Sequence, residues 1–187
     1  SYSCDSLNQN AIAVIPHDGQ YLVVGIYQGS NHYSAFYVRA LNLLGDVVWE
    51  KTVDEGPEHR MISGGGSFIP TDDGNFVIAA TKCLEGNRLC EASTQSITLI
   101  KRDENGEVIW KNNLHNAGIH SAREVAPTTD GGFVVVGYQK LEDGKMHAYI
   151  AKLDAEGEME WDNQLRIGNK SVALPVEVTP NNDYILS

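Results

Sequence analysis

PTTDGGFVVVGYQ, residues 127–139, joins a turn signal directly to an apolar strand, and similar stretches recur along the chain. They are PHDGQYLVVGIYQ from Pro16, PTDDGNFVIAATK from Pro70 and the final PNNDYILS from Pro180. One aromatic residue follows each turn, and these markers are Tyr21, Phe76, Phe133 and Tyr184, at spacings of 55, 57 and 51 residues. Self-similarity at a period of this size predicts a repeat architecture.

A second motif keeps the same period. Each of the three tryptophans, Trp49, Trp110 and Trp161, stands four residues after a glycine, and these glycines are Gly45, Gly106 and Gly157. An acidic residue follows each glycine, and an Asn or Asp precedes it by three residues. An Asx side chain can bond backbone amides and glycine accepts a positive φ, so the motif predicts a tight hairpin turn. The fixed place of the tryptophans favours a packing role between sheets over a role as ligand platforms.

Within a unit the hydrophobic period is two. Runs such as FVVVGYQ (133–139), HAYIAKLD (147–154) and EMEWDNQL (158–165) are rich in β-branched and aromatic residues and are separated by turns, as strands of an antiparallel sheet should be. A further strand precedes each turn, and no stretch carries an amphipathic helix. We predict an all-β single domain over residues 1–187, with four-stranded units at about 8–54, 62–115 and 121–166 and a partial unit at 172–187.

Repeated four-stranded units of this length predict the blades of a β-propeller. TTDGGFVVVGYQ (128–139) and AYIAKLDAEGEMEW (148–161) resemble the repeats of bacterial secreted and cell-surface propeller proteins, T-x-D-G-G-[FY]-[IV]-x-x-G followed by L-x-K-[LT]-D-x-x-G-x-x-x-W. The third unit matches this pattern best and the first most loosely. The D-x-x-G-E-x-x-W part also resembles the tryptophan-docking motif of quinoprotein dehydrogenases. That resemblance implies blade-to-blade packing by Trp49, Trp110 and Trp161, and nothing about quinone chemistry.

The number of units raises the question of ring closure. Three units and two strands of a fourth fall short of the roughly four to eight blades of closed propellers. We therefore expect either a piece of a longer propeller that lacks its C-terminal blades, or an open arc that self-associates through its terminal units. Exposed edge strands invite pairing, and a C2 arrangement is the simplest one for identical chains.

Composition narrows the class of partner. The chain has 187 residues, of which 42% are hydrophobic, enough for a substantial core. Its 14 Lys and Arg against 25 Asp and Glu give a net charge of -11 without a basic cluster, so we expect no nucleic-acid partner. The longest apolar runs are strand-sized and far below the roughly 20 residues that span a bilayer, so we expect no membrane insertion.

The cysteines indicate the cellular compartment in which the protein is found. Cys83 and Cys90 close the short loop CLEGNRLC (83–90), which lies in the longest of the three units, and a local disulfide would clamp such a loop. A metal site lacks further ligands at zinc spacing, two free thiols remain possible, and Cys4 is left over. A disulfide implies an oxidising compartment, so we predict a secreted, periplasmic or cell-surface protein.

No catalytic, cofactor or metal motif stands out. The six histidines are scattered without an HExxH pattern, and no nucleophile elbow is present, so we assign no catalytic residue, cofactor or metal ligand. Propellers usually bind at one end of the central channel, through loops between units and between second and third strands. In those loops the candidate ligand-binding residues are His59, Arg60, His120, Arg123 and Glu124.

The sequence leaves two classes of function open. A noncatalytic binding or scaffold module that recognises glycan or protein through these loops is favoured, because no catalytic constellation recurs. The alternative is a propeller hydrolase or lyase that acts on an extracellular polymer. Fold alone cannot decide between them, but a convergent carboxylate pair with raised pKa in the channel would favour the enzyme.

Overall fold

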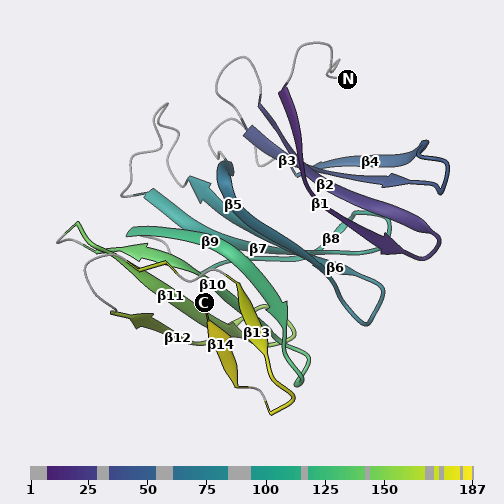
Figure 1. The fold of residues 1–187 in the computed structure, drawn as a ribbon. Helices are drawn as coiled ribbons and strands as arrows, with labels where there is room; N and C mark the ends of the chain where they lie inside the picture. The colour runs from purple at the N-terminus through teal and green to yellow at the C-terminus, as the bar shows by residue number, and fades with distance from the viewer. Residues whose placement is uncertain are drawn as a thin grey trace.

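The computed structural model describes residues 8–28, 34–53, 61–83, 94–114, 118–141, 144–166, 171–172, 175–181 and 183–186. These residues form fourteen β-strands, labelled β1 to β14 in Figure 1, and no helix. The predicted all-β class is therefore confirmed. No helix in the described ranges is long and apolar enough to cross a membrane.

Each of the three predicted units contains four consecutive antiparallel strands. Unit one consists of β1 (Asn8–His17), β2 (Gln20–Gln28), β3 (Ser34–Leu41) and β4 (Val47–Val53). Unit two consists of β5 (Met61–Pro70), β6 (Phe76–Cys83), β7 (Thr94–Arg102) and β8 (Val108–Asn113). Unit three consists of β9 (Gly118–Pro127), β10 (Phe133–Lys140), β11 (Met146–Leu153) and β12 (Met159–Leu165). A two-stranded hairpin follows, β13 (Val176–Val178) with β14 (Tyr184–Leu186).

The three predicted units do not form three separate sheets. Units two and three form one eight-stranded sheet, because β7 pairs with β9 in parallel over Thr94↔Gly118 and Gln95↔Ile119. Both strands begin at the same end of the molecule and run in the same direction. Their first residues can therefore exchange backbone hydrogen bonds where the chain passes from unit two to unit three.

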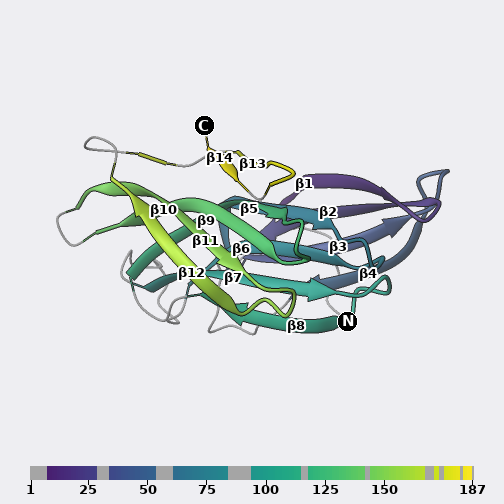
Figure 2. The same ribbon diagram turned by 90° about the horizontal axis from the view of Figure 1, so that it is seen from below.

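The sheets stack face to face in chain order, as the colour sequence in Figures 1 and 2 shows. Strand β6 demonstrates why, since all eight of its residues are buried. Phe76 and Ile78 belong to a cluster shared with β2 and β3, whereas Val77 and Ala79 belong to a cluster shared with unit three. Period-two alternation thus gives one strand two buried faces.

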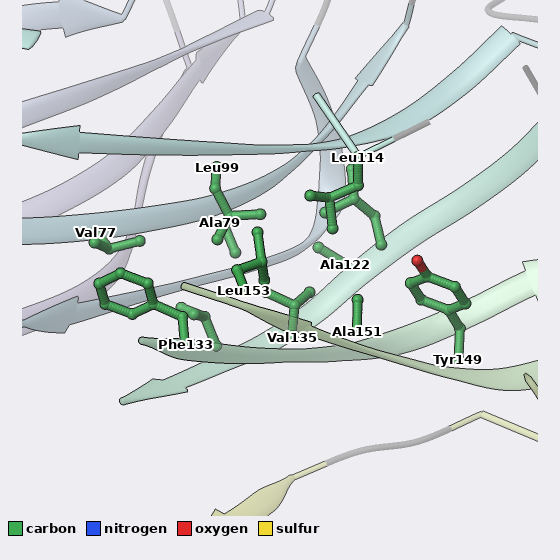
Figure 3. Packing of buried hydrophobic residues seen from close by; sticks show 12 residues of the cluster. Val77, Ala79, Leu99, Leu114, Ala122, Phe133, Val135, Tyr149, Ala151 and Leu153 are labelled. Carbon is green, nitrogen blue, oxygen red and sulfur yellow. The ribbon is translucent and has the colours of Figure 1, made fainter. Parts of the chain in front are cut away.

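Unit three repeats this arrangement. Phe133 and Val135 of β10 face unit two, and Val134 and Val136 on the other face pack with β13 and β14. Figure 3 shows the cluster between units two and three, which extends from Phe133 beside Val77 to Tyr149 at its far end. Fully burying one such apolar side chain contributes about 1.5–3 kcal/mol, so these faces hold successive units together.

The hairpin turns between third and fourth strands form as predicted. Gly45, Gly106 and Gly157 have φ of 88°, 79° and 79°. In the second turn, Asp103 Oδ1 accepts hydrogen bonds from the amides of Asn105 and Glu107, at 2.9 and 2.8 Å. Asn42 and Asp154 cap their own turns in the same way. The local sequence of each turn therefore determines its conformation.

A tryptophan of one unit lies on the turn glycine of the next. A Cβ atom placed on Gly106 would lie 2.8 Å from the Trp49 ring, and one placed on Gly157 would lie 2.6 Å from the Trp110 ring. We call this arrangement the Trp–Gly contact. Polar bonds accompany it: Lys51 pairs with Glu107 at 2.5 Å, and Asn112 Nδ2 donates to the carbonyl of Glu156 at 3.2 Å.

Candidate functional site

Each unit has two distinct ends. At the turn end lie the tight turns that join first to second and third to fourth strands, such as 128–132 and 154–158 of unit three. At the loop end lie the connections between second and third strands and those between units. The predicted ligand-binding residues belong to the loop end.

The structure does not bring these five residues together. His59 and Arg60 lie outside the described residues. His120, Arg123 and Glu124 all lie on β9, but they make contacts of different kinds. The Arg123 guanidinium lies 5.4 Å from the centre of the Tyr138 ring, and Glu124 Oε2 accepts a hydrogen bond from the Val176 amide at 3.2 Å. Glu124 therefore helps to anchor β13.

His120 belongs to a different group, a row of polar side chains across three neighbouring strands. Gln139 of β10 is the cross-strand partner of both His120 on β9 and His147 on β11. Cross-strand partners point to the same face of a sheet, so the three side chains lie together at the loop end of unit three. We call them the polar row. His120 is 2% exposed and His147 is 4% exposed.

Gln139 and His147 were not among the binding residues predicted from the sequence. A signal was present, because Gln139 continues the alternation of Phe133 and Val135, and His147 stands two residues before Tyr149 in a buried strand. The alternation alone would have pointed both polar side chains to a covered face. The sequence did not indicate the register between β9, β10 and β11, and that register places both side chains beside His120.

Tyr149 lies next to the polar row, at the end of the apolar cluster between units two and three. Its ring is 5.3 Å from the ring of His120 in an edge-on arrangement. Burial, together with the charge of Asp162 and the hydrogen bond to that carboxylate, raises the pKa of the Tyr149 phenol. This phenol therefore stays protonated at physiological pH and acts as a hydrogen-bond donor. On the unit-two side, Thr81 Oγ1 accepts a bond from the Ala122 amide at 3.1 Å.

Two buried polar atoms of the row lack partners among the described residues. They are Gln139 Oε1 and His147 Nδ1. A buried polar atom without a hydrogen bond costs about 1–3 kcal/mol, and native structures contain few of them. An amide acceptor and an imidazole nitrogen can bond hydroxyl groups, but both atoms are shielded from solvent in this structure, so a ligand reaches them only when the side chains turn outward.

The turn end differs from the polar row in that two of its carboxylates are paired with lysine side chains. Asp130 accepts a hydrogen bond from Thr128 at 2.5 Å, and Lys152 Nζ lies 3.1 Å from the same carboxylate. Asp73 is held in the same way by Thr71 and Lys101. The network therefore recurs in units two and three, as expected of a structural feature.

The pKa shifts at the turn end agree with this structural role. The hydrogen bonds from Thr128 and from the Gly132 amide, with the nearby Lys152, lower the pKa of Asp130 to about 2. Burial opposes ionisation of Asp73, but bonds from Lys101, Thr71 and Asn75 outweigh it, so that pKa is also lowered. These shifts are opposite to the raised pKa that a general acid would need.

A cavity of about 420 Å³ opens at this turn end, lined by residues that include Lys101, Asp73, Thr128 and Phe133. It lies at the opposite end of the strands from the polar row. Lys101 and Asp73 are paired with each other in the structural network of the turn, and the other charged group of the lining is the exposed Asp72. We therefore place the candidate site at the polar row.

No group of three or more His, Cys, Asp or Glu side chains that could hold a metal ion converges in the described ranges. Cys83 is fully buried at the end of β6. The predicted partner Cys90 lies outside the described residues, as does Cys4. The Cys83–Cys90 pairing therefore stays a prediction.

The chain was compared with family models, curated proteins and solved structures. No family model matches the chain, and no curated protein matches it. Among solved structures, the chain is similar to a bifunctional GH43-CE protein of Bacteroides eggerthii, at 13% identity and a TM-score of 0.49. The match covers 97% of this chain but 23% of that protein, so the chain spans about a quarter of its length. A likeness of this level says nothing about activity or ligand.

Proposed function

We propose that the chain is a noncatalytic β-propeller-type binding module of a secreted or cell-surface protein, and that it recognises a glycan at the loop end of unit three. The observation that carries the proposal is the polar row. Gln139 Oε1 and His147 Nδ1 are buried hydrogen-bonding atoms without described partners, and rotation of these side chains toward the loop end would let glycan hydroxyl groups bond both.

The surroundings of the polar row favour binding over catalysis. The ring of the fully buried Tyr149 packs edge-on against His120 and so holds that side chain in the polar row. Asp130 and Asp73, whose pKa values are lowered, belong to the turn networks at the other end. The polar row itself contains no carboxylate.

The propeller assignment is supported by the stacking of the units. Three successive four-stranded units pack face to face, and the Trp–Gly contact joins unit one to unit two and unit two to unit three. Each unit thus presents its strands and loops in the same order to a common end, which is how propeller blades assemble a loop face.

A glycan array tests the binding proposal, followed by calorimetry with the glycan that binds best. We expect Gln139→Met, which keeps the shape of the side chain and removes the acceptor, to weaken binding about tenfold. The free energy of unfolding should not fall, because the substitution also removes an unsatisfied buried atom. Lys140→Met, on the exposed neighbour, is the matched control and should leave binding unchanged.

The same experiment can reject the proposal. Absence of glycan binding above background, or equal binding by wild type, Gln139→Met and His147→Leu, would exclude the polar row as a glycan site. Release of new reducing ends from a bound polysaccharide would support the hydrolase or lyase alternative instead.

Secretion is the part of the proposal that depends on the predicted Cys83–Cys90 disulfide. Intact mass should rise by two hydrogens on reduction of protein isolated from its native compartment. Two thiols that are alkylated without reduction would contradict both the bridge and the oxidising compartment.

A further inference from the structure

Trp49 and Trp110 each lie on the turn glycine of the next unit, and Trp161 does not have this contact among the described residues. Trp110 packs on Phe133, the marker aromatic of the next unit, with ring centres 6.0 Å apart, and it also lies on Gly157. Trp161 packs on the next marker aromatic, Tyr184, at 5.8 Å. The described part of unit four has two strands, β13 and β14, and neither carries a glycine turn that could cover the rest of the ring.

Trp161 is accordingly 41% exposed, and other parts of the same region are open as well. Met159, two residues earlier on β12, is 42% exposed. Strand β14 pairs with β13 alone among the described strands, so no described strand pairs with its outer edge. We call Met159, Trp161, Asn163 and the outer edge of β14 the Trp161 surface.

Asn163 provides a hydrogen-bonding group beside Trp161. It stands two residues after Trp161, as Asn112 stands after Trp110, and Asn112 Nδ2 donates to the backbone carbonyl before Gly157. Asn163 Oδ1 already accepts a bond from the Gln164 amide at 2.8 Å. Its amide group is left to donate to a turn carbonyl in the same way.

We infer that the Trp161 surface binds a β-hairpin whose turn has the form Asx-x-x-Gly-acid, like the hairpins between third and fourth strands within this chain. The first strand of the hairpin pairs with the outer edge of β14, as β11 pairs with β10. Its turn glycine lies on the Trp161 ring, as Gly157 lies on Trp110, and Asn163 bonds the carbonyl before that glycine.

A hairpin fits this surface better than a complete sheet. Strands β13 and β14 already cover the face formed by Val134, Val136 and Ile150, where the first two strands of another unit would lie. A four-stranded sheet of a second copy would overlap them. A two-stranded partner would occupy only the Trp161 surface and would leave β13 and β14 in place.

The probe is a fluorophore-labelled peptide of residues 146–165, closed by a disulfide after Ala148→Cys and Leu165→Cys, since these positions are cross-strand partners. An isolated hairpin is marginally stable, and closing it removes much of its ordering cost. Its hairpin conformation is first verified by NMR. Fluorescence anisotropy should then show saturable binding below about 1 mM peptide.

Variants on both sides test the geometry. Trp161→Ala in the protein and Gly157→Ala in the peptide should each weaken binding at least about tenfold, because both remove the aromatic contact at the centre of the interface. Ile109→Ala, which removes an exposed apolar side chain from the outer strand of unit two, is the matched control and should bind like wild type. Asn163→Ala should have a smaller effect in the same direction.

Two results would overturn the inference. One is the absence of saturable binding by a peptide that is shown to be a hairpin. The other is equal binding by wild type and Trp161→Ala, each checked for native folding by circular dichroism, because the peptide would then bind elsewhere.

Discussion

At the scale of single residues, the three tryptophans occupy the same place in their units but differ in environment. Trp49 and Trp110 are partly buried in the clusters between units, whereas Trp161 is 41% exposed. The difference follows from what the next unit provides. A turn glycine lies against each of the first two rings, and the described part of unit four supplies only Tyr184 to the third.

Trp110→Ala should therefore cost more stability than Trp161→Ala. Because the Trp110 ring is partly rather than fully buried, we expect a loss of about 2–3 kcal/mol, somewhat below the range for fully buried aromatic residues. Trp161→Ala should cost about 1 kcal/mol or less, as do most substitutions at exposed positions. Urea unfolding of both variants measures the difference, and equal losses would show that the Trp–Gly contact does not stabilise the fold.

The turn glycines offer a second comparison. Gly157 and Gly45 both have positive φ, so alanine strains the backbone at each by roughly 1–2 kcal/mol. Only at Gly157 would the new Cβ also meet a ring, at 2.6 Å from Trp110, whereas nothing lies within 4 Å at Gly45. Gly157→Ala should thus destabilise the protein by about 1–3 kcal/mol more than Gly45→Ala. Similar free energies of unfolding would contradict the close packing.

At the scale of elements, the turns between first and second strands are held by charge. In unit three, Thr128 and Lys152 both bond Asp130. Lys152 is buried, which alone would lower its pKa, but its bonds to Asp130 and Glu160 outweigh burial and raise the pKa. The network connects the turn after β9 to β11 and β12, so it aligns three strands of the unit.

This network predicts a loss of stability in acid. The pKa of Asp130 is about 2 in the folded protein, against about 3.9 in an unfolded chain. A lowered folded pKa gives a contribution that is complete above the unfolded pKa and disappears as pH falls through the folded one. The free energy of unfolding should therefore decrease between about pH 4 and pH 2.

The variant Asp130→Asn tests whether Asp130 causes this loss of stability in acid. The variant should be less stable than wild type at pH 7, because the pair with Lys152 is lost, and its further loss between about pH 4 and pH 2 should be smaller. Chemical unfolding at a series of pH values measures both effects. Parallel curves for wild type and variant would show that Asp130 does not contribute to the acid dependence.

At the scale of the whole molecule, the stack of units has two end faces. On unit one, Leu43, Leu44, Val47 and Val48 are 69%, 89%, 55% and 52% exposed. The positions of Leu43 and Leu44 carry Glu104 and Asn105 in unit two, which are exposed but polar. Val47 and Val48 correspond to Val108 and Ile109, which are exposed to a similar extent, so the two leucines are what distinguish the turn of unit one. An apolar turn at one end of the stack is a candidate contact surface, and we propose that copies of the chain associate through it.

Sedimentation velocity over a range of protein concentrations tests this proposal. We expect concentration-dependent association of the wild type that is weakened in the double variant Leu43→Ser/Leu44→Ser. The corresponding change in unit two, Glu104→Ser/Asn105→Ser, is the matched control and should associate like wild type. A monomer at all concentrations would contradict association through this end.

The strands and the turns could be predicted because their causes are local. A period of two places alternate side chains on opposite faces, and Asx and Gly at fixed offsets determine a tight turn. The turn at residues 154–158 could therefore be predicted from its own sequence, without the rest of the chain. The recurrence of the marker aromatics and tryptophans then indicated units that stack on one another.

The polar row and the Trp161 surface could not be predicted in this way. Whether His120, Gln139 and His147 meet depends on the register of three strands, and a bulge in β9 between the partners of Val136 and Gly137 shifts that register. The pairing of β7 with β9 and the exposure of Trp161 depend on where whole sheets lie. The sequence by itself determined the units and their turns, because short-range backbone preferences suffice for them. Only the tertiary structure decided which side chains become neighbours and which faces stay open, because those depend on contacts between residues far apart in the chain.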